Sequence, residues 1–227
     1  MLTIQLEIEK IDYERSLANI LPQMVDKLAE KQAPSDMERY LVKLGGDAVP
    51  VAKKLLGYME ISTKDALIVW LINSRQAEFA GTANSYMEET LSGKVVQIGG
   101  FSAEDLPGTR LNLSAVQVSI DYLALFNSPI FSDSPVSGAA RLALKMMSPE
   151  MLEKQSITLL NSELVKPKVL STISEGVRRS GLAVTFRDIK LTEGTVVPEQ
   201  GDPHLPDSIK DALADALIQW LREAVSS

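Results

Sequence analysis

The chain has 227 residues, a formal net charge of −7 and a hydrophobic content of 45%. These are ordinary values for a globular protein and argue against a disordered chain. The acidic charge argues against nucleic acid or anionic membrane as a partner, because both bind to basic surfaces. The sequence has no cysteine, which excludes disulfides, thiolate nucleophiles and zinc sites with sulfur ligands.

The first residues lack the basic and apolar regions of a signal peptide. The longest apolar run, from Ala66 to Ile72, is much shorter than the ~20 residues of a membrane-spanning helix. We therefore expect a soluble, cytoplasmic protein with no membrane partner.

The chain begins with a predicted strand, because apolar and polar residues alternate from Leu2 to Glu9. Asp12 follows as an expected helix N-cap. Pro22 should kink or break the helix that starts there. Further helices are predicted in the first half over residues 36–44, 50–56, 62–72 (capped by Ser62) and 75–91.

The second half predicts a similar order of elements. A strand is expected over residues 111–120, and then helices over 138–147, 149–160 and 167–179. A final strand starts at Leu182. Its apolar phase changes near Arg187-Asp188, and the strand after residue 95 changes phase near Gly99-Gly100, so we expect a β-bulge at both places.

Identical residues recur at fixed offsets between the two halves. A shift of 88 positions lays Asn73-Ser74 on Asn161-Ser162 and Ser92-Gly93 on Ser180-Gly181. A shift of 109 lays Ile11-Asp12-Tyr13 on residues 120–122. This pattern predicts an internal duplication, with 21 additional residues in the first copy.

The predicted fold class is α+β. Two degenerate strand–helices–strand repeats, residues 1–105 and 109–194, would form a mainly antiparallel or mixed four-stranded sheet with helices packed on it. The halves would be related by a pseudo-twofold axis. A helical insertion is expected near residues 32–46, and an acidic Pro/Gly loop over 195–206 leads to a C-terminal segment, 207–227.

That last segment predicts an amphipathic helix from Ser208 to Ala224, with Ser208 and Asp211 as a capping box. Its apolar face must be buried. We expect it to pack on its own chain with Trp220 as the anchor, and the alternative is a homodimer contact.

His204 is the only histidine, and it lies among acidic residues. The candidate metal or acid–base site comprises Glu199, Asp202, His204 and Asp207. A single histidine and a loop setting favour the simpler interpretation of an exposed acidic loop, so no metal is expected.

Two other sets of residues occur in matching contexts. Asp12 and Asp121 would form a catalytic carboxylate pair if they met near the axis, but helix N-caps explain both more simply. The candidate ligand-binding residues are Asn73, Ser74, Asn161 and Ser162, for which a polar turn is the favoured interpretation.

No catalytic motif is recognisable, since the glycine pairs lack phosphate-loop spacing and no serine lies in a G-x-S-x-G sequence. The favoured prediction is a non-catalytic interaction or structural module. An enzyme is the less expected class. The alternatives are a small apolar-molecule binding protein with a cavity between the repeats, and an enzyme with a carboxylate-based site. The expected partner is another protein or a small molecule, the chain is a monomer or a homodimer, and no cofactor is expected.

Overall fold

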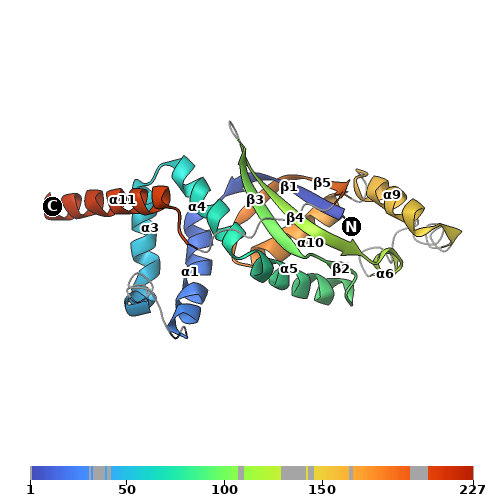
Figure 1. Cartoon of the computed structure of the whole chain (residues 1–227), viewed down its shortest axis with the longest axis horizontal. Helices are drawn as coiled ribbons and strands as arrows, with labels where there is room; N and C mark the ends of the chain where they lie inside the picture. The colour runs from blue at the N-terminus through green and yellow to red at the C-terminus, as the bar shows by residue number, and fades with distance from the viewer. Residues whose placement is uncertain are drawn as a thin grey trace.

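The computed structural model describes residues 2–30, 32, 39, 42–106, 110–128, 142, 146–163, 166–194 and 204–226. This part of the chain is α+β, as predicted (Figure 1). The expected helices over residues 36–44 and 138–147, the insertion near 32–46 and the loop over 195–206 lie largely outside the described residues.

Five strands form the sheet of the described chain: β1 (Leu2–Ile11), β2 (Val96–Gln97), β3 (Gly100–Leu106), β4 (Arg110–Ile120) and β5 (Val184–Glu193). The strand order is β2-β4-β1-β5, and β3 pairs with β4 beside β2. Every pair is antiparallel. The sheet therefore has five described strands where four were expected. The expected strand after residue 95 is interrupted at Ile98 and Gly99 and forms both β2 and β3.

The central pair of the sheet is β1 with β4. Gln5 lies opposite Ser114, with Leu6 opposite Leu113 on one side and Ile4 opposite Ala115 on the other. Alternate residues of β1, among them Ile4 and Leu6, are buried, whereas Gln5 is exposed. One face of the sheet therefore carries the core and the other faces water, as the alternating sequence predicts.

The outer strands are irregular where the apolar phase changes. In the β1–β5 ladder the register shifts on both sides of Ile8, which pairs with Phe186, so that Arg187 has no partner in the ladder. Both Phe186 and Ile189 can then be buried. The other interruption places Gly99 against Gln117, where an added Cβ would lie only 2.6 Å from Oε1 of that glutamine.

The described helices are α1 (Tyr13–Ala29), α3 (Ala48–Tyr58), α4 (Ile61–Ser74), α5 (Gln76–Leu91), α6 (Tyr122–Asn127), α9 (Pro149–Leu160), α10 (Lys166–Arg179) and α11 (Asp207–Ser226). A 3-10 turn, Gly45–Asp47, precedes α3. None of these helices is long and apolar enough to cross a membrane.

Three details of the predicted helices are corrected by the structure. Helix α1 is not broken at Pro22, because the burial of Ile20, Leu21 and Val25 offsets the ~3 kcal/mol that an interior proline costs. Helix α4 is preceded by Glu60 as N-cap and not by Ser62. Helix α11 begins at Asp207, so Ser208 lies inside it.

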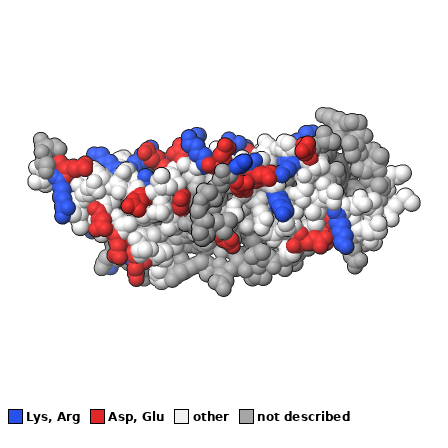
Figure 2. Space-filling model, turned by 90° about the horizontal axis from the view of Figure 1, so that it is seen from above, with Lys and Arg blue, Asp and Glu red and all other residues white. Residues whose placement is uncertain are grey.

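The helices cover the apolar face of the sheet. Helices α5 and α10 pack against each other and against β3 and β5, respectively, and α4 also packs on β3. Figure 1 shows α1, α3 and α11 at one end of the molecule and α6 and α9 at the other. Figure 2 shows a face of the molecule on which acidic and basic side chains intermingle.

Helix α11 packs on α3 and α4 of its own chain. Its buried residues are Ile209 and Ala216, which are 1% and 3% exposed, and Ala216 joins a small cluster with Leu56 and Met59. Trp220 is only partly buried, with the Lys54 ammonium 5.4 Å from the centre of its ring. The expected anchor is therefore replaced by residues nearer the start of the helix.

Two isoleucines of α11 test this arrangement. Ile209→Ala should lower the free energy of unfolding by about 2–4 kcal/mol, because it removes a fully buried side chain. Ile218→Ala is the matched control, since Ile218 is 47% exposed, and it should cost less than ~1 kcal/mol. Urea unfolding followed by circular dichroism measures both. Equal losses would show that α11 is not docked by its first turns.

Candidate functional site

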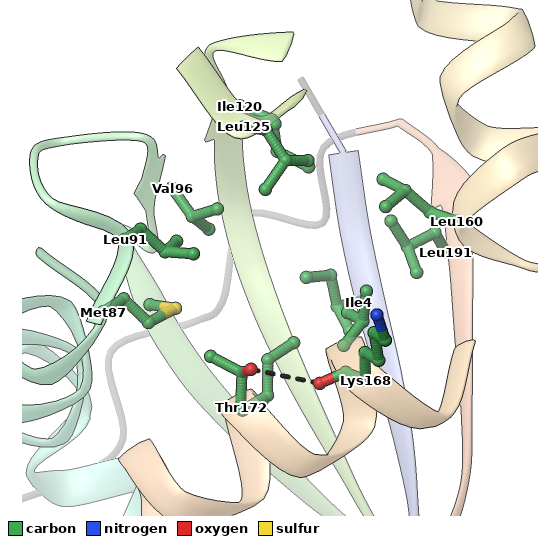
Figure 3. A pocket seen from close by; sticks show the side chains of 12 residues that line it. Ile4, Met87, Leu91, Val96, Ile120, Leu125, Leu160, Lys168, Thr172 and Leu191 are labelled. Carbon is green, nitrogen blue, oxygen red and sulfur yellow. Dashed lines mark hydrogen bonds between the residues drawn. The ribbon is translucent and has the colours of Figure 1, made fainter. Parts of the chain in front are cut away.

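An apolar pocket lies between the sheet and helices of both halves (Figure 3). Its walls come from strands β1, β2, β4 and β5 and from helices α5, α6, α9 and α10, and include Ile4, Met87, Leu91, Val96, Leu160 and Leu191. The cavity volume is about 40 Å³. That is room for a water or a methyl-sized group, and well below the ~150 Å³ of a cavity that holds benzene.

The pocket offers little polar chemistry. The Thr172 hydroxyl donates a hydrogen bond of 3.0 Å to the carbonyl oxygen of Lys168 on the same helix, as Figure 3 shows. The Lys168 side chain is exposed. What this arrangement can do chemically is to enclose a small apolar group.

The pocket exists because α9 packs less closely on the sheet than α4 does. Helix α4 packs closely on β3, and the space beside it is filled by Ile72, Phe79 and Phe101. Helix α9 contacts β5 through few residues. Leu160 at its end is buried, but Met151 near its start is 54% exposed. In Figure 1, α9 projects away from the sheet.

Asp12 and Asp121 do not meet. Each follows one of the two central strands, and these strands are antiparallel, so the carboxylates lie at opposite ends of β1 and β4, roughly 40 Å apart at the usual ~3.3 Å per residue. Asp12 Oδ1 accepts a hydrogen bond from the backbone N–H of Arg15, and Asp121 Oδ1 accepts one from Ala124. Both are helix N-caps, and they cannot share a proton.

Asn73 and Asn161 bind the backbone of neighbouring strands. The Asn73 amide donates to the carbonyl oxygen of Ala103 at 2.9 Å and accepts from its N–H at 2.8 Å. Asn161 makes the same two hydrogen bonds with Leu191, both at 2.9 Å. These side chains therefore satisfy backbone groups beside the core.

The serines that follow these asparagines take part in local helix-end contacts. The Ser74 hydroxyl donates to the carbonyl oxygen of Leu71, and the carbonyl oxygen of Ser162 accepts from the N–H of Lys166. Neither serine lines the apolar pocket. The structure therefore does not bring the four candidate ligand-binding residues together in one site.

The candidate metal site is described only in part, because Glu199 and Asp202 lie outside the described residues. The backbone carbonyl of His204 accepts a 3.0 Å hydrogen bond from the Trp70 indole. Asp207 pairs with Lys210 at 2.7 Å, and this hydrogen bond lowers the pKa of the Asp207 carboxyl. In the described part of the chain, no three potential metal-binding side chains gather.

Tyr122 and Asp188 also have pKa values shifted by their surroundings. Burial, with a smaller contribution from Glu153, raises the pKa of Tyr122 to about 12. A hydrogen bond from Lys166, whose ammonium lies 2.5 Å from the carboxylate, lowers the pKa of Asp188. Both shifts follow from packing and ion pairing, and neither group lines the apolar pocket.

Comparison of the chain with models of protein families, with curated proteins and with solved structures finds no match. The surfaces and cavities of the protein are therefore the features from which its function can be inferred.

The asparagines allow a direct test of their structural role. Asn73→Ala and Asn161→Ala should each lower the free energy of unfolding by about 2 kcal/mol, because each leaves a backbone N–H and carbonyl beside the core unsatisfied. Asn127→Ala, at the exposed end of α6, is the matched control and should change stability by less than ~0.5 kcal/mol. Chemical unfolding measures all three, and unchanged stability in the first two would contradict the assignment.

Proposed function

We propose that this protein is a non-catalytic structural module that associates with a second copy of itself through the outer face of α11. The observation that carries the proposal is a row of exposed apolar side chains on the second half of this helix, the α11 stripe. Its members are 41%, 47%, 52% and 88% exposed, in the order Leu217, Ile218, Leu221 and Val225.

The stripe is exposed because the apolar face of α11 is wider than the surface that α3 and α4 cover. Ile209 and Ala216 occupy the side that faces α3 and α4. Leu217, Leu221 and Val225, spaced by four residues, form the adjacent side. In water, such side chains forgo ~1.5–3 kcal/mol each when fully exposed, so a partner that covers them gains free energy.

A second copy suits this surface. Figure 1 shows that the C-terminal turns of α11 project beyond the rest of the molecule, so two such helices can approach without steric obstruction. A twofold axis between residues 218 and 219 would place Leu217 near Leu221 of the other copy, because such an interface uses the same patch on both subunits. It would also bring Arg222 of each copy to Asp215 of the other. These two residues lie seven positions apart and on the same flank of the helix.

The size of the stripe predicts a weak association. Its four side chains expose roughly 400 Å² together, so a dimer buries about 800 Å², which is less than the ~1,200 Å² typical of stable complexes. A dissociation constant on the order of 0.1 mM is expected.

The small apolar pocket and the separation of the two carboxylates favour a module without chemistry over the two alternatives. The cavity of about 40 Å³ is too small for an apolar ligand of ordinary size, which disfavours the binding protein. The roughly 40 Å between Asp12 and Asp121, at ~3.3 Å per residue, disfavours an enzyme that uses them as a pair.

We also propose that the module arose by internal duplication. The start of α4 and the start of α9 are 88 residues apart, and so are the ends of α5 and α10. The hydrogen bonds of Asn73 with Ala103 and of Asn161 with Leu191 have the same offset.

The sheet supports the same proposal. Ile4 of β1 pairs with Leu191 of β5. The offset of 109 leads from Ile4 to Leu113, and the offset of 88 leads from Leu191 back to Ala103. Leu113 and Ala103 also pair with each other, in β4 and β3. Superposing residues 61–105 on residues 149–193 in an experimental structure tests the idea. A drifting offset along the superposition would contradict it.

Self-association is measured by sedimentation equilibrium between 10 µM and 1 mM protein, concentrations chosen to bracket the expected constant. The parent should dimerise, and Leu217→Asp should be monomeric, because it buries a charge in the interface. Leu123→Asp is the matched control, since Leu123 on α6 has the same exposure of 41%.

A charge exchange tests the antiparallel arrangement. Asp215→Arg and Arg222→Asp should each weaken the dimer, and the double variant should restore it. A parent that stays monomeric throughout, or a Leu123→Asp variant that loses association equally, would contradict the proposal.

A further inference from the structure

A polar groove lies at the end of β1, apart from the apolar pocket and from α11. Its volume is about 280 Å³. It is bounded by the end of β1, the first turns of α1, the last turn of α10 and the segment that leads into β5. It is therefore much larger than the apolar pocket, and large enough for a small molecule.

The lining of this groove is basic in a chain whose formal charge is −7. Among its described lining residues, Lys10, Arg15 and Arg178 are cationic and Asp12 is the one carboxylate. Arg178 is held by Glu175 on its own helix at 2.8 Å. Among the described residues, no ion pair forms on the side chain of Lys10 or Arg15. Two of the three cations thus line the groove without an ion pair to a described residue.

The floor of the groove is fixed by hydrogen bonds between α1 and the segment before β5. The N–H of Asp12 donates to the carbonyl oxygen of Ala183 at 2.9 Å, and the N–H of Ala183 donates to the buried Ser16 hydroxyl at 2.9 Å. Asn19 donates to the carbonyl oxygen of Gly181. Gly181 has φ of 100°, and a Cβ there would lie 2.8 Å from Ile20, so glycine permits this close approach.

The corresponding place in the other half has the same backbone contact but not the charges. The N–H of Asp121 donates to the carbonyl oxygen of Val95, as Asp12 does to Ala183. At the offsets of 109 and 88, the positions of Lys10, Arg15 and Arg178 are taken by Ser119, Ala124 and Thr90. The backbone contact therefore forms without the three cations, which makes a role in binding the better explanation for them.

We propose that this groove binds a phosphate-bearing small molecule. Guanidinium groups match the oxygens of a phosphate with paired, charge-assisted hydrogen bonds, and the Lys10 ammonium adds a third positive charge. The volume leaves space beyond one phosphate group, so a phosphomonoester or a diphosphate of a small metabolite fits better than inorganic phosphate alone. Asp12, already bound to the N–H of Arg15, holds the first turn of α1 in place.

Inorganic pyrophosphate is the probe, with binding followed by isothermal titration calorimetry and 31P NMR at low ionic strength. The parent should bind it, and added salt should weaken binding because the site is open to solvent. Arg15→Gln and Arg178→Gln should each weaken binding about tenfold. Arg179→Gln is the matched control, since Arg179 is the next residue but does not line the groove, and it contacts Glu89, Glu175 and the Tyr86 ring. It should bind like the parent.

Three outcomes would overturn the proposal. The parent could fail to bind 10 mM pyrophosphate, a concentration far above that expected for a charged site with three cations. Arg179→Gln could lose as much affinity as Arg178→Gln, which would indicate unspecific attraction. Citrate could bind as tightly as pyrophosphate, which would make the site one for polyanions in general. The variants are exposed, and circular dichroism verifies that each is folded.

Discussion

The antiparallel pairing of β1 with β4 is the contact on which the rest of the structure depends. Both outer edges of the sheet are attached to this pair, β5 on β1 and β3 on β4. Residues far apart in sequence, such as Leu6 and Leu113, must meet to join the β1–β5 pair to the β3–β4 hairpin. The helices then cover the face to which Ile4 and Leu6 point. The same pairing sends Asp12 and Asp121 to opposite ends, so one contact fixes both the core and the separation of the carboxylates.

Asparagine side chains connect the helices to this sheet. Asn73 in α4 and Asn161 after α9 each take up both backbone groups of a strand residue, and Asn84 in α5 does so with Ile98 beside the interrupted strand. An amide suits this position because it carries a donor and an acceptor side by side. Since these bonds fix only the ends of α4 and α9, the remainder of each helix is free to differ. Helix α4 packs on β3, and α9 turns away and leaves the small pocket.

The parts of the fold that the sequence predicts are those with local patterns. The alternation from Leu2 to Glu9 predicts β1, and the change of phase near Arg187 predicts the irregular ladder, because both depend on neighbours in the chain. The break predicted at Pro22 is wrong because it depends on tertiary packing and not on neighbours in the chain. Its local cost is overcome by the burial of Leu21 and Val25 against residues such as Ala48, which no local pattern reveals. Asn73 and Asn161 stand out in the sequence, but their hydrogen bonds span 30 residues, so their role depends on the tertiary structure.

The groove near Asp12 could not be predicted from sequence, because Lys10, Arg15 and Arg178 form no motif and converge only when α10 ends beside α1. Helix α11 has no counterpart in the first half, and the three cations have none at the matching positions. Under the proposed duplication, the core common to both halves needs neither feature. Helix α11 leaves apolar side chains in water, and the cations bring like charges together. Features that cost free energy and are not needed for the common architecture are best explained by what they bind. The candidate functions of this protein therefore lie where its two halves differ.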